Sequence, residues 1–301
     1  MHEILLYYKY TAIANPGEFC RTQKLLCEKL GLKGRIIIAP EGINGTVEGA
    51  PKNTQKYINE TTSDPRFADM NFKRSPGTGN AFPKLSVKVR SEIVSAHLGN
   101  DDVNPAITTG KYLSPEQLHD WIHGRKEFYI IDMRNDYEQA VGFFKNSILP
   151  PLGHFRDLPK ILPQLAHLKN KTVVTVCTGG VRCEKASGFL VKHGFKDVYQ
   201  LHNGIVSYME KYPDEDFAGK LYVFDGRVTM AFSSPEKEHE IVGHCRKCHV
   251  PNENFVNCLL PTCHDHFICC ANCLNKKGEP FCSWRCALAQ KLRLLVATIS
   301  A

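Results

Sequence analysis

The chain has 301 residues, 43% hydrophobic and 23% charged, which is ordinary for a globular protein and long enough for two or three domains. No apolar run approaches the ~18 residues that a membrane span requires, and the N-terminus lacks a signal-peptide pattern. Nine of the 13 cysteines lie between Cys245 and Cys286, where thiol chemistry and metal binding are favoured over disulfides. We therefore expect a protein of the reducing cytoplasm with no membrane partner.

The net charge of +7 is unevenly distributed along the chain. Lys and Arg outnumber Asp and Glu by 14 to 9 in residues 1–100 and by 9 to 6 in residues 226–301. Residues 101–225 are nearly balanced, with 15 basic and 16 acidic side chains. Two basic flanks suit a polyanionic partner such as RNA, because phosphate contacts supply most of the non-specific affinity. A solvated basic surface without a partner is the alternative.

Residues 1–95 alternate between strand and helix patterns. The predicted elements are strands at 4–10, 34–39, 46–48, 72–74 and 85–89, helices at 16–30 and 51–59, and a turn at 42–45. This β-α-β-β-α-β order predicts a ferredoxin-like fold. The stretch 39–46 (APEGINGT) resembles the acylphosphatase-like module that opens one particular rhodanese family.

Basic and aromatic side chains gather late in this first domain, and their residue types suit RNA, whose phosphates pair with cations and whose bases stack on aromatics. The predicted RNA-binding residues are Lys73, Arg74, Lys84, Lys88 and Arg90. Lys84, Lys88 and Arg90 would share one face of a strand, because side chains there alternate with period two. Phe72 and Phe82 lie among them, and core packing of both rings is the alternative to base stacking.

Residues 96–111 have the composition of a linker, and residues 112–220, with a core at about 123–217, again alternate between strands and helices. The predicted strands 128–133, 172–176 and 198–201 and the helix 184–191 indicate a parallel sheet with helices on both faces. In such sheets ligands bind at the carboxyl ends of the strands. The strand 172–176 ends directly before a cysteine at this edge.

The sequence CTGGVRC follows that strand and is the most informative stretch of the chain. Its residues are Cys177, Thr178, Gly179, Gly180, Val181, Arg182 and Cys183. A glycine loop on a helix N-terminus, beside an arginine, stabilises a thiolate and makes Cys177 a candidate nucleophile. A buried structural cysteine is the alternative. The loop resembles that of rhodanese-type sulfurtransferases, whose first cysteine carries a persulfide; tyrosine-phosphatase loops are one residue longer, so sulfur fits better than phosphate.

The stretch 132–138 (DMRNDYE) is similar to the N-terminal signature of rhodanese domains. In that signature an acidic residue and an arginine end a buried strand and a glutamate follows. The resemblance implies supporting roles at the site for Asp132, Arg134 and Glu138.

Residues 221–301 contain a predicted hairpin at 222–229, with Asp225 and Gly226 as a type I′ turn, and then a cysteine-rich tail. The tail pairs its cysteines as Cys245 and Cys248, Cys258 and Cys263, Cys270 and Cys273, and Cys282 and Cys286. Eight thiolates are enough for two tetrahedral zinc sites, with metal supplying the folding energy. We favour an interleaved arrangement, first with third pair and second with fourth. Sequential pairing, a disulfide tail and an iron–sulfur site are the alternatives.

The whole chain resembles the bacterial oxygen-dependent tRNA uridine(34) hydroxylase family. The matching stretches are 39–45, 82–94, 132–138, 155–159 and 177–186, together with the paired cysteines of the tail. The resemblance implies hydroxylation at C5 of the wobble uridine of tRNA, with molecular oxygen as co-substrate. It also implies that the family's catalytic cysteine, with its persulfide, is Cys177.

Residue chemistry by itself supports a nucleophilic thiolate, an RNA partner and a zinc-binding tail. We find no NAD, flavin or iron motif, so oxygen activation has no explanation at this level. A persulfide sulfurtransferase, with Cys183 as the resolving thiol, is the alternative enzyme. A non-enzymatic scaffold is a third reading, and the intact Cys177 argues against it.

Overall fold

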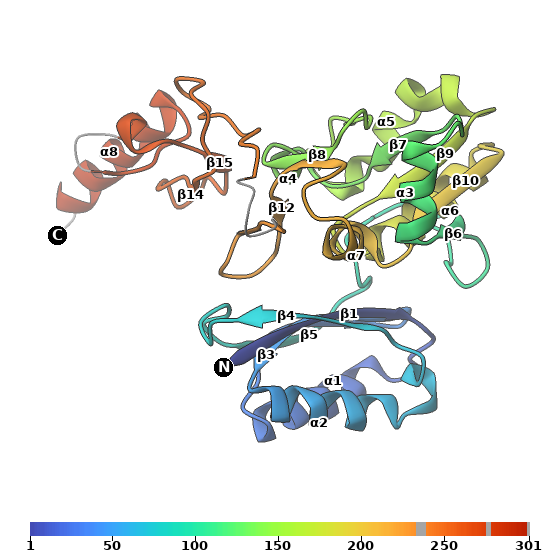
Figure 1. Ribbon diagram of the computed structural model, residues 1–301. Coiled ribbons are helices and arrows are strands. Elements are labelled where there is room, and N and C mark those ends of the chain that lie inside the picture. The colour runs from blue at the N-terminus through green and yellow to red at the C-terminus, as the bar shows by residue number, and fades with distance from the viewer. Residues whose placement is uncertain (233–238, 275–277, 300–301) are drawn as a thin grey trace.

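The computed structural model describes residues 1–232, 239–274 and 278–299, with side chains to residue 294. Figure 1 shows an N-terminal domain below, a central α/β domain above it, and a C-terminal region beside the central domain. Both sequence-predicted domain types are present. No helix among the described residues is both long and apolar enough to cross a membrane.

The N-terminal domain is one five-stranded sheet covered on one face by two helices. Its elements are β1 (His2–Tyr10), α1 (Pro16–Lys29), β2 (Lys33–Ala39), β3 (Gly42–Gly49), α2 (Pro51–Thr62), β4 (Phe72–Gly77) and β5 (Leu85–Val89). The strand order is β4-β1-β3-β2-β5, and only the pair β2–β5 is parallel. This ferredoxin-like arrangement turns the free face of the sheet toward the central domain (Figure 1).

Period-two alternation sorts the side chains of these strands between the two faces. Leu5 and Tyr7 of β1 lie in the core against the helices, where Tyr57 of α2 also packs. Leu6 and Tyr8, which alternate with them, point the other way. The sequence therefore builds two different surfaces from one strand, an apolar core and a face available to the rest of the molecule.

The predicted turn at residues 42–45 is wrong, because these residues begin β3. The chain reverses instead at Pro40 and Glu41, between β2 and β3. Gly45 serves close packing: a Cβ there would lie 2.4 Å from the ring of Tyr7 on the neighbouring strand. Gly45 is thus explained by the space that the ring of Tyr7 needs and not by a turn.

The central domain has a four-stranded parallel sheet with helices on both faces, as predicted. Its main elements are β6 (Lys111–Leu113), α3 (Pro115–His123), β7 (Tyr129–Asp132), α5 (Leu158–Leu165), β9 (Thr172–Val176), α6 (Val181–Lys192), β10 (Asp197–Leu201) and α7 (Gly204–Lys211). The strand order is β6-β10-β9-β7. Helices α5 and α6 contribute to one hydrophobic core, and α3 and α7 contribute to the other. Ser114 caps α3 with a capping box, as its position before Pro115 predicts.

The segment 96–111, predicted as a linker, is packed against the central domain. Ala96 and Leu98 belong to the core that contains α5 and α6, and the Gly110 N–H donates to Ser187 Oγ at 2.8 Å. The segment 96–111 therefore has the composition of a linker but packs against the central domain. This segment, which follows the N-terminal domain, is hydrogen-bonded directly to α6.

The remaining elements are short, apart from the last helix. They are α4 (Asp136–Gln139), β8 (Gly142–Phe144), β11 (Phe217–Gly219), β12 (Leu221–Tyr222), β13 (Thr229–Met230), β14 (Phe255–Asn257), β15 (His266–Ile268) and α8 (Trp284–Ile299). Strands β12 and β13 form the expected hairpin, but six residues connect them, so the two-residue type I′ turn is wrong. The connecting loop docks on the N-terminal domain instead, since the Gly226 N–H donates to the Ala81 carbonyl at 2.7 Å.

Candidate active site and metal centres

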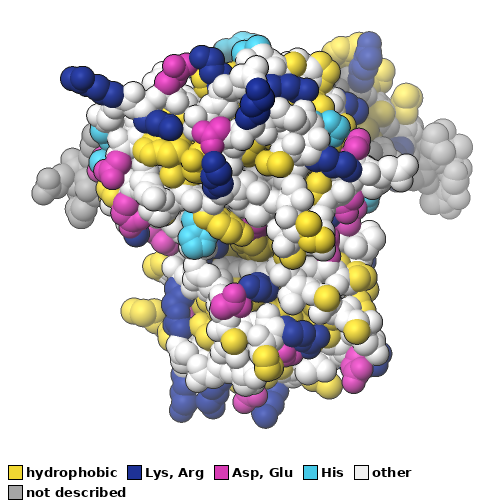
Figure 2. Space-filling view, turned by 90° about the vertical axis from the view of Figure 1, so that its right-hand side faces the viewer, with side chains coloured by type: hydrophobic (Ala, Val, Ile, Leu, Met, Phe, Trp, Pro, Cys, Tyr) yellow, Lys and Arg dark blue, Asp and Glu magenta, His cyan; other side chains and the backbone are white. Residues whose placement is uncertain are grey.

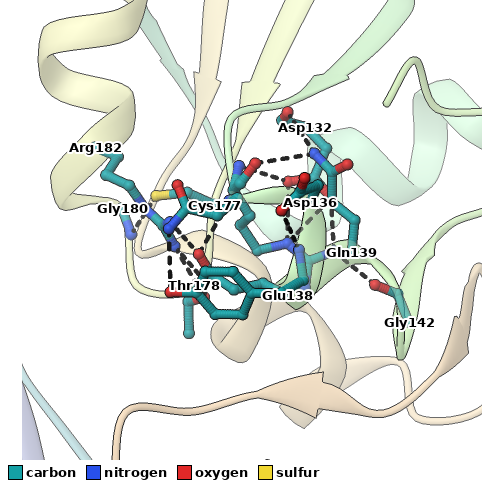
Figure 3. Close-up of polar contacts among 12 residues, drawn as sticks. Asp132, Asp136, Glu138, Gln139, Gly142, Cys177, Thr178, Gly180 and Arg182 are labelled. Atoms are coloured by element: carbon teal, nitrogen blue, oxygen red, sulfur yellow. Dashed lines mark hydrogen bonds and ion pairs between the residues drawn. The ribbon is translucent and has the colours of Figure 1, made fainter. Parts of the chain in front are cut away.

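The loop after β9 delivers Cys177 to the N-terminus of α6. This helix begins at Val181, three residues earlier than predicted, so Arg182 and Cys183 lie in its first turn. The Gly180 N–H donates to Cys177 Sγ at 3.3 Å (Figure 3). A sulfur held by loop N–H groups at the positive end of a helix dipole is stabilised as a thiolate.

The glycine pair of the loop also lets the N-terminal domain approach Cys177. Gly180 has φ +103°, and a Cβ on it would lie 2.7 Å from the Tyr8 hydroxyl. A Cβ on Gly179 would lie 3.0 Å from Leu6 Cδ2. Strand β1 therefore presses its free face onto the loop, and Cys177 is 0% exposed. The thiol is shielded from bulk water by residues of another domain.

A buried ion pair holds the arginine of the loop in place. Arg182 Nη2 donates to Glu138 Oε2 at 2.8 Å, and the second carboxylate oxygen accepts from Nη1 (Figure 3). Arg182 Nη2 also lies 3.3 Å from Thr178 Oγ1. A bidentate pair fixes a guanidinium geometrically as well as electrostatically. Glu138 therefore positions Arg182 beside Cys177.

Asp132 and Arg134 brace the end of β7 and do not contact the sulfur. Arg134 Nη2 donates to Asp132 Oδ2 and to the Gly142 carbonyl, each at 2.6 Å, and both side chains of the pair are fully buried. The Asn135 N–H, directly after this pair, donates to Glu138 Oε1 at 3.0 Å, so the chain after β7 also positions the carboxylate that binds Arg182.

The two cysteines of the loop have opposite pKa shifts. Burial alone raises the pKa of Cys177, but the Cys183 thiol, the Arg182 guanidinium and the loop N–H groups outweigh burial and lower it. The pKa of Cys183 is raised by burial and by its hydrogen bond to the Cys177 sulfur. At neutral pH the site therefore holds one thiolate and one thiol, with Cys183 as the donor.

A cleft of about 520 Å³ opens above this loop, between the N-terminal and central domains. Its charged and aromatic lining residues are Arg35, Tyr8, His154, Phe155, Arg156, Arg182 and Phe224, and Cys177 also lines it. Figure 2 shows the molecule narrowing between the N-terminal domain, lower in the view, and the domain above. None of the lining residues is acidic, so the cleft suits an anionic ligand.

The five predicted RNA-binding residues lie on different surfaces. Lys73 is only 8% exposed and lies 5.4 Å from the ring of Tyr8, between the domains, where burial lowers its pKa to about 8. Arg74, next along β4, pairs instead with Glu3 at 3.1 Å. The prediction of one surface containing both residues is therefore wrong, because neighbouring residues of β4 face opposite sides of the sheet.

The other three basic residues are exposed and lie in or next to one edge strand. Lys84, Lys88 and Arg90 are exposed at the edge strand β5. Lys88 is in register with Ile37 of β2, a residue that lines the cleft, so its side chain lies on the cleft face of the sheet. That Lys84 and Arg90 share this face remains a prediction from alternation. Phe82 is only 3% exposed and packs in the interior, which was the alternative to base stacking.

The paired cysteines of the tail form two groups of four, and in each group the ligand atoms all lie within 4.8 Å of one another. The groups are Cys245, Cys248, Cys270 and Cys273, and Cys258, Cys263, Cys282 and Cys286. This is the interleaved pairing. Sulfur–sulfur distances of 3.4–3.6 Å are close to the edge of about 3.8 Å of a tetrahedron with Zn–S bonds of ~2.3 Å. The donor set therefore fits zinc.

Each of the three parts of the chain matches a known domain family. Residues 2–93 match the UPF0176 acylphosphatase like domain, residues 114–211 a rhodanese-like domain, and residues 218–287 the domain described as Rhodanase C-terminal. A protein of Cytophaga hutchinsonii named tRNA uridine(34) hydroxylase is 43% identical over 285 residues, covering 95% of this chain and 89% of its own. This chain belongs to the tRNA uridine(34) hydroxylase family.

Two further relatives with the same name support this assignment. That of Bacillus licheniformis is 45% identical over 272 residues, 89% of this chain and 83% of its own. That of Bacillus mycoides is 42% identical over 299 residues, 98% and 92% respectively. The resemblance drawn from the sequence is thus confirmed, and so is the fold of each domain.

Sequence reasoning missed several residues of this family member's cleft. Arg35 is a charged residue within the otherwise apolar strand β2, where Ile36 and Ile38 are buried. This charge was the available signal that the other face of the strand is polar. Arg156 lies in the stretch 155–159 that carries part of the family resemblance, but nothing in the sequence joined it to Cys177. Their common cleft exists only because two domains meet.

Proposed function

We propose that this chain hydroxylates uridine 34 of tRNA and that Cys177 is its catalytic thiol. The observation that carries the proposal is a thiolate-stabilising loop at the base of an acid-free, basic cleft in a member of this family. Reaction at C5 of the base, with molecular oxygen as co-substrate, follows from the family resemblance.

The surrounding residues hold and protect the sulfur. Glu138 orients Arg182, whose charge stabilises the thiolate, while Cys183 donates to it. The same loop N–H groups suit a persulfide on Cys177. Leu6 and Tyr8 shield the loop from bulk water. A substrate therefore reaches the Cys177 thiolate through the cleft.

The experiment that tests this function is nucleoside analysis of tRNA from cells lacking the protein, complemented with wild-type or variant genes. We expect 5-oxidised wobble uridine to disappear and to return with the wild-type gene only. High mass resolution is needed, because adding oxygen and exchanging oxygen for sulfur give nearly the same mass. Loss of a thiolated base instead would establish sulfur transfer and contradict hydroxylation.

We further propose that Lys84, Lys88 and Arg90 bind tRNA phosphates. Replacing all three with Ala should weaken binding and flatten the dependence of log K on log salt by about 0.7–0.9 for each phosphate that the variant no longer neutralises. The matched control replaces Lys29, Lys52 and Lys56, which are exposed on α1 and α2 at the opposite face of the sheet. If the two triple variants had equal slopes of log K against log salt, tRNA would bind to a different surface of the protein.

We also propose that each four-cysteine group binds one structural zinc ion, and that the protein works in the cytoplasm. The geometry of the thiols supports the first statement. The second is supported by the tRNA substrate that the relatives' name gives and by 13 free cysteines, which suit a reducing compartment.

A further inference from the structure

Two arginines from different domains line the cleft above Cys177. Arg35 comes from β2 of the N-terminal domain, and Arg156 comes from the short turn Phe155–Asp157 of the central domain. Both are exposed, and among the described residues neither forms an ion pair. Arg182, by contrast, is neutralised by Glu138. The cleft therefore carries two guanidinium groups whose charge no carboxylate balances.

An exposed aromatic ring completes the cleft. Phe224, in the loop between β12 and β13, lines it and is 46% exposed, unlike most phenylalanines of the chain. The Arg182 guanidinium carbon lies 5.7 Å from the centre of this ring, so Phe224 lies near the loop of Cys177. An exposed ring beside two free guanidinium groups is the combination by which proteins hold an unstacked nucleotide.

The walls of the cleft are held together before any ligand arrives. Tyr8 Oη donates to Glu184 Oε1 at 2.9 Å, and Lys185 Nζ lies 2.8 Å from Glu41 Oε2, which joins the N-terminal domain to α6. Arg227 Nη1 donates to Ser75 Oγ at 3.0 Å, which joins the loop of Phe224 to β4. These contacts tie all three walls to one another.

We propose that the cleft receives a single everted nucleotide, with its base on Phe224 and its flanking phosphates on Arg35 and Arg156. The volume of about 520 Å³ lies in the range of pockets that hold one small molecule. The proposal rests on the proposed function, because the base that reaches Cys177 is then uridine 34. It adds the binding mode: the nucleotide leaves the stack of the anticodon loop, and its two phosphates are held by opposite domains.

The test uses the full chain and tRNA carrying 5-fluorouridine at position 34, where fluorine replaces the hydrogen that hydroxylation removes. On binding, the fluorine resonance should shift, and Phe224→Leu should remove most of this shift while tRNA remains bound. Arg35→Gln and Arg156→Gln should each weaken binding and flatten the salt slope by about 0.7. The control is Arg125→Gln, an exposed arginine that does not line the cleft.

The two proposals fail in different ways. An unshifted resonance at position 34, or arginine variants that behave like Arg125→Gln, would overturn the everted-nucleotide mode even if uridine 34 is modified. A shifted resonance only when fluorouridine occupies another position, with the arginine effects retained, would support the clamp and refute uridine 34 as the target. Normal binding with slower modification in both arginine variants would also contradict a phosphate clamp.

Discussion

Replacing Cys177 with Ser is expected to abolish tRNA modification and to remove acid alkylation at this loop. The substitution keeps the size of a fully buried side chain, so the fold should persist. A serine hydroxyl does not ionise under these conditions, so no anion replaces the thiolate. At about pH 6 an ordinary thiol of pKa ~8.5 is almost entirely protonated, and labelling there reports thiols whose pKa is lowered. The measurement is nucleoside analysis together with peptide mapping after a small alkylating reagent.

The neighbouring cysteine supplies a matched pair of controls. Cys183 keeps its proton because its pKa is raised, and it donates to the Cys177 thiolate. Cys183→Ala removes the donor, so the pKa of Cys177 should rise and the midpoint of its labelling should move to higher pH. Cys183→Ser retains a donor and should move the midpoint less and keep part of the activity. Acidic labelling of Cys183 in the wild-type protein would reverse the assignment of the nucleophile.

The parts of the site that the sequence predicts are those formed by neighbouring residues. A strand, a cysteine, two glycines, an arginine and a helix follow one another within residues 172–192, so local pattern suffices. The cysteine pairs are also local, but the sequence left both the interleaved and the sequential combination open, and the fold brings the interleaved groups together. Family resemblance implied a supporting role for Glu138, but its ion pair with Arg182, 44 residues away, was not predicted.

The parts that the sequence does not predict depend on contacts between domains. Tyr8 and Glu184 are 176 residues apart, and no periodicity connects them. The glycine at position 180 has a local reason, its positive φ, and a distant one, the hydroxyl of Tyr8 against it. The same limitation explains the error at Lys73: charge and strand pattern indicate a surface residue, but the central domain covers it.

Removing metal from the tail is expected to unfold residues 245–286 and leave the sheets of the other domains intact. The small core there consists largely of the cysteines themselves, with a few larger apolar side chains such as Leu260, Phe267 and Phe281. Without a cation, four thiol groups that converge within 4.8 Å lose their common partner. Structural zinc contributes about 10–16 kcal/mol in small zinc domains, far more than this core can supply. The loss should therefore be complete and confined to the tail.

Metal analysis should find about two zinc ions per chain, one for each tetrahedral group. Amide hydrogen exchange before and after chelation should show protection lost in β14 and β15 and retained in β9 and β10. Cys258→Ser, inside one group, should release one ion. Cys269→Ser should release none, because Cys269 is also buried but belongs to neither group. This matched pair separates loss of a ligand from loss of a buried thiol. A tail that stays protected after chelation, with all its thiols reduced, would show that packing rather than metal folds it.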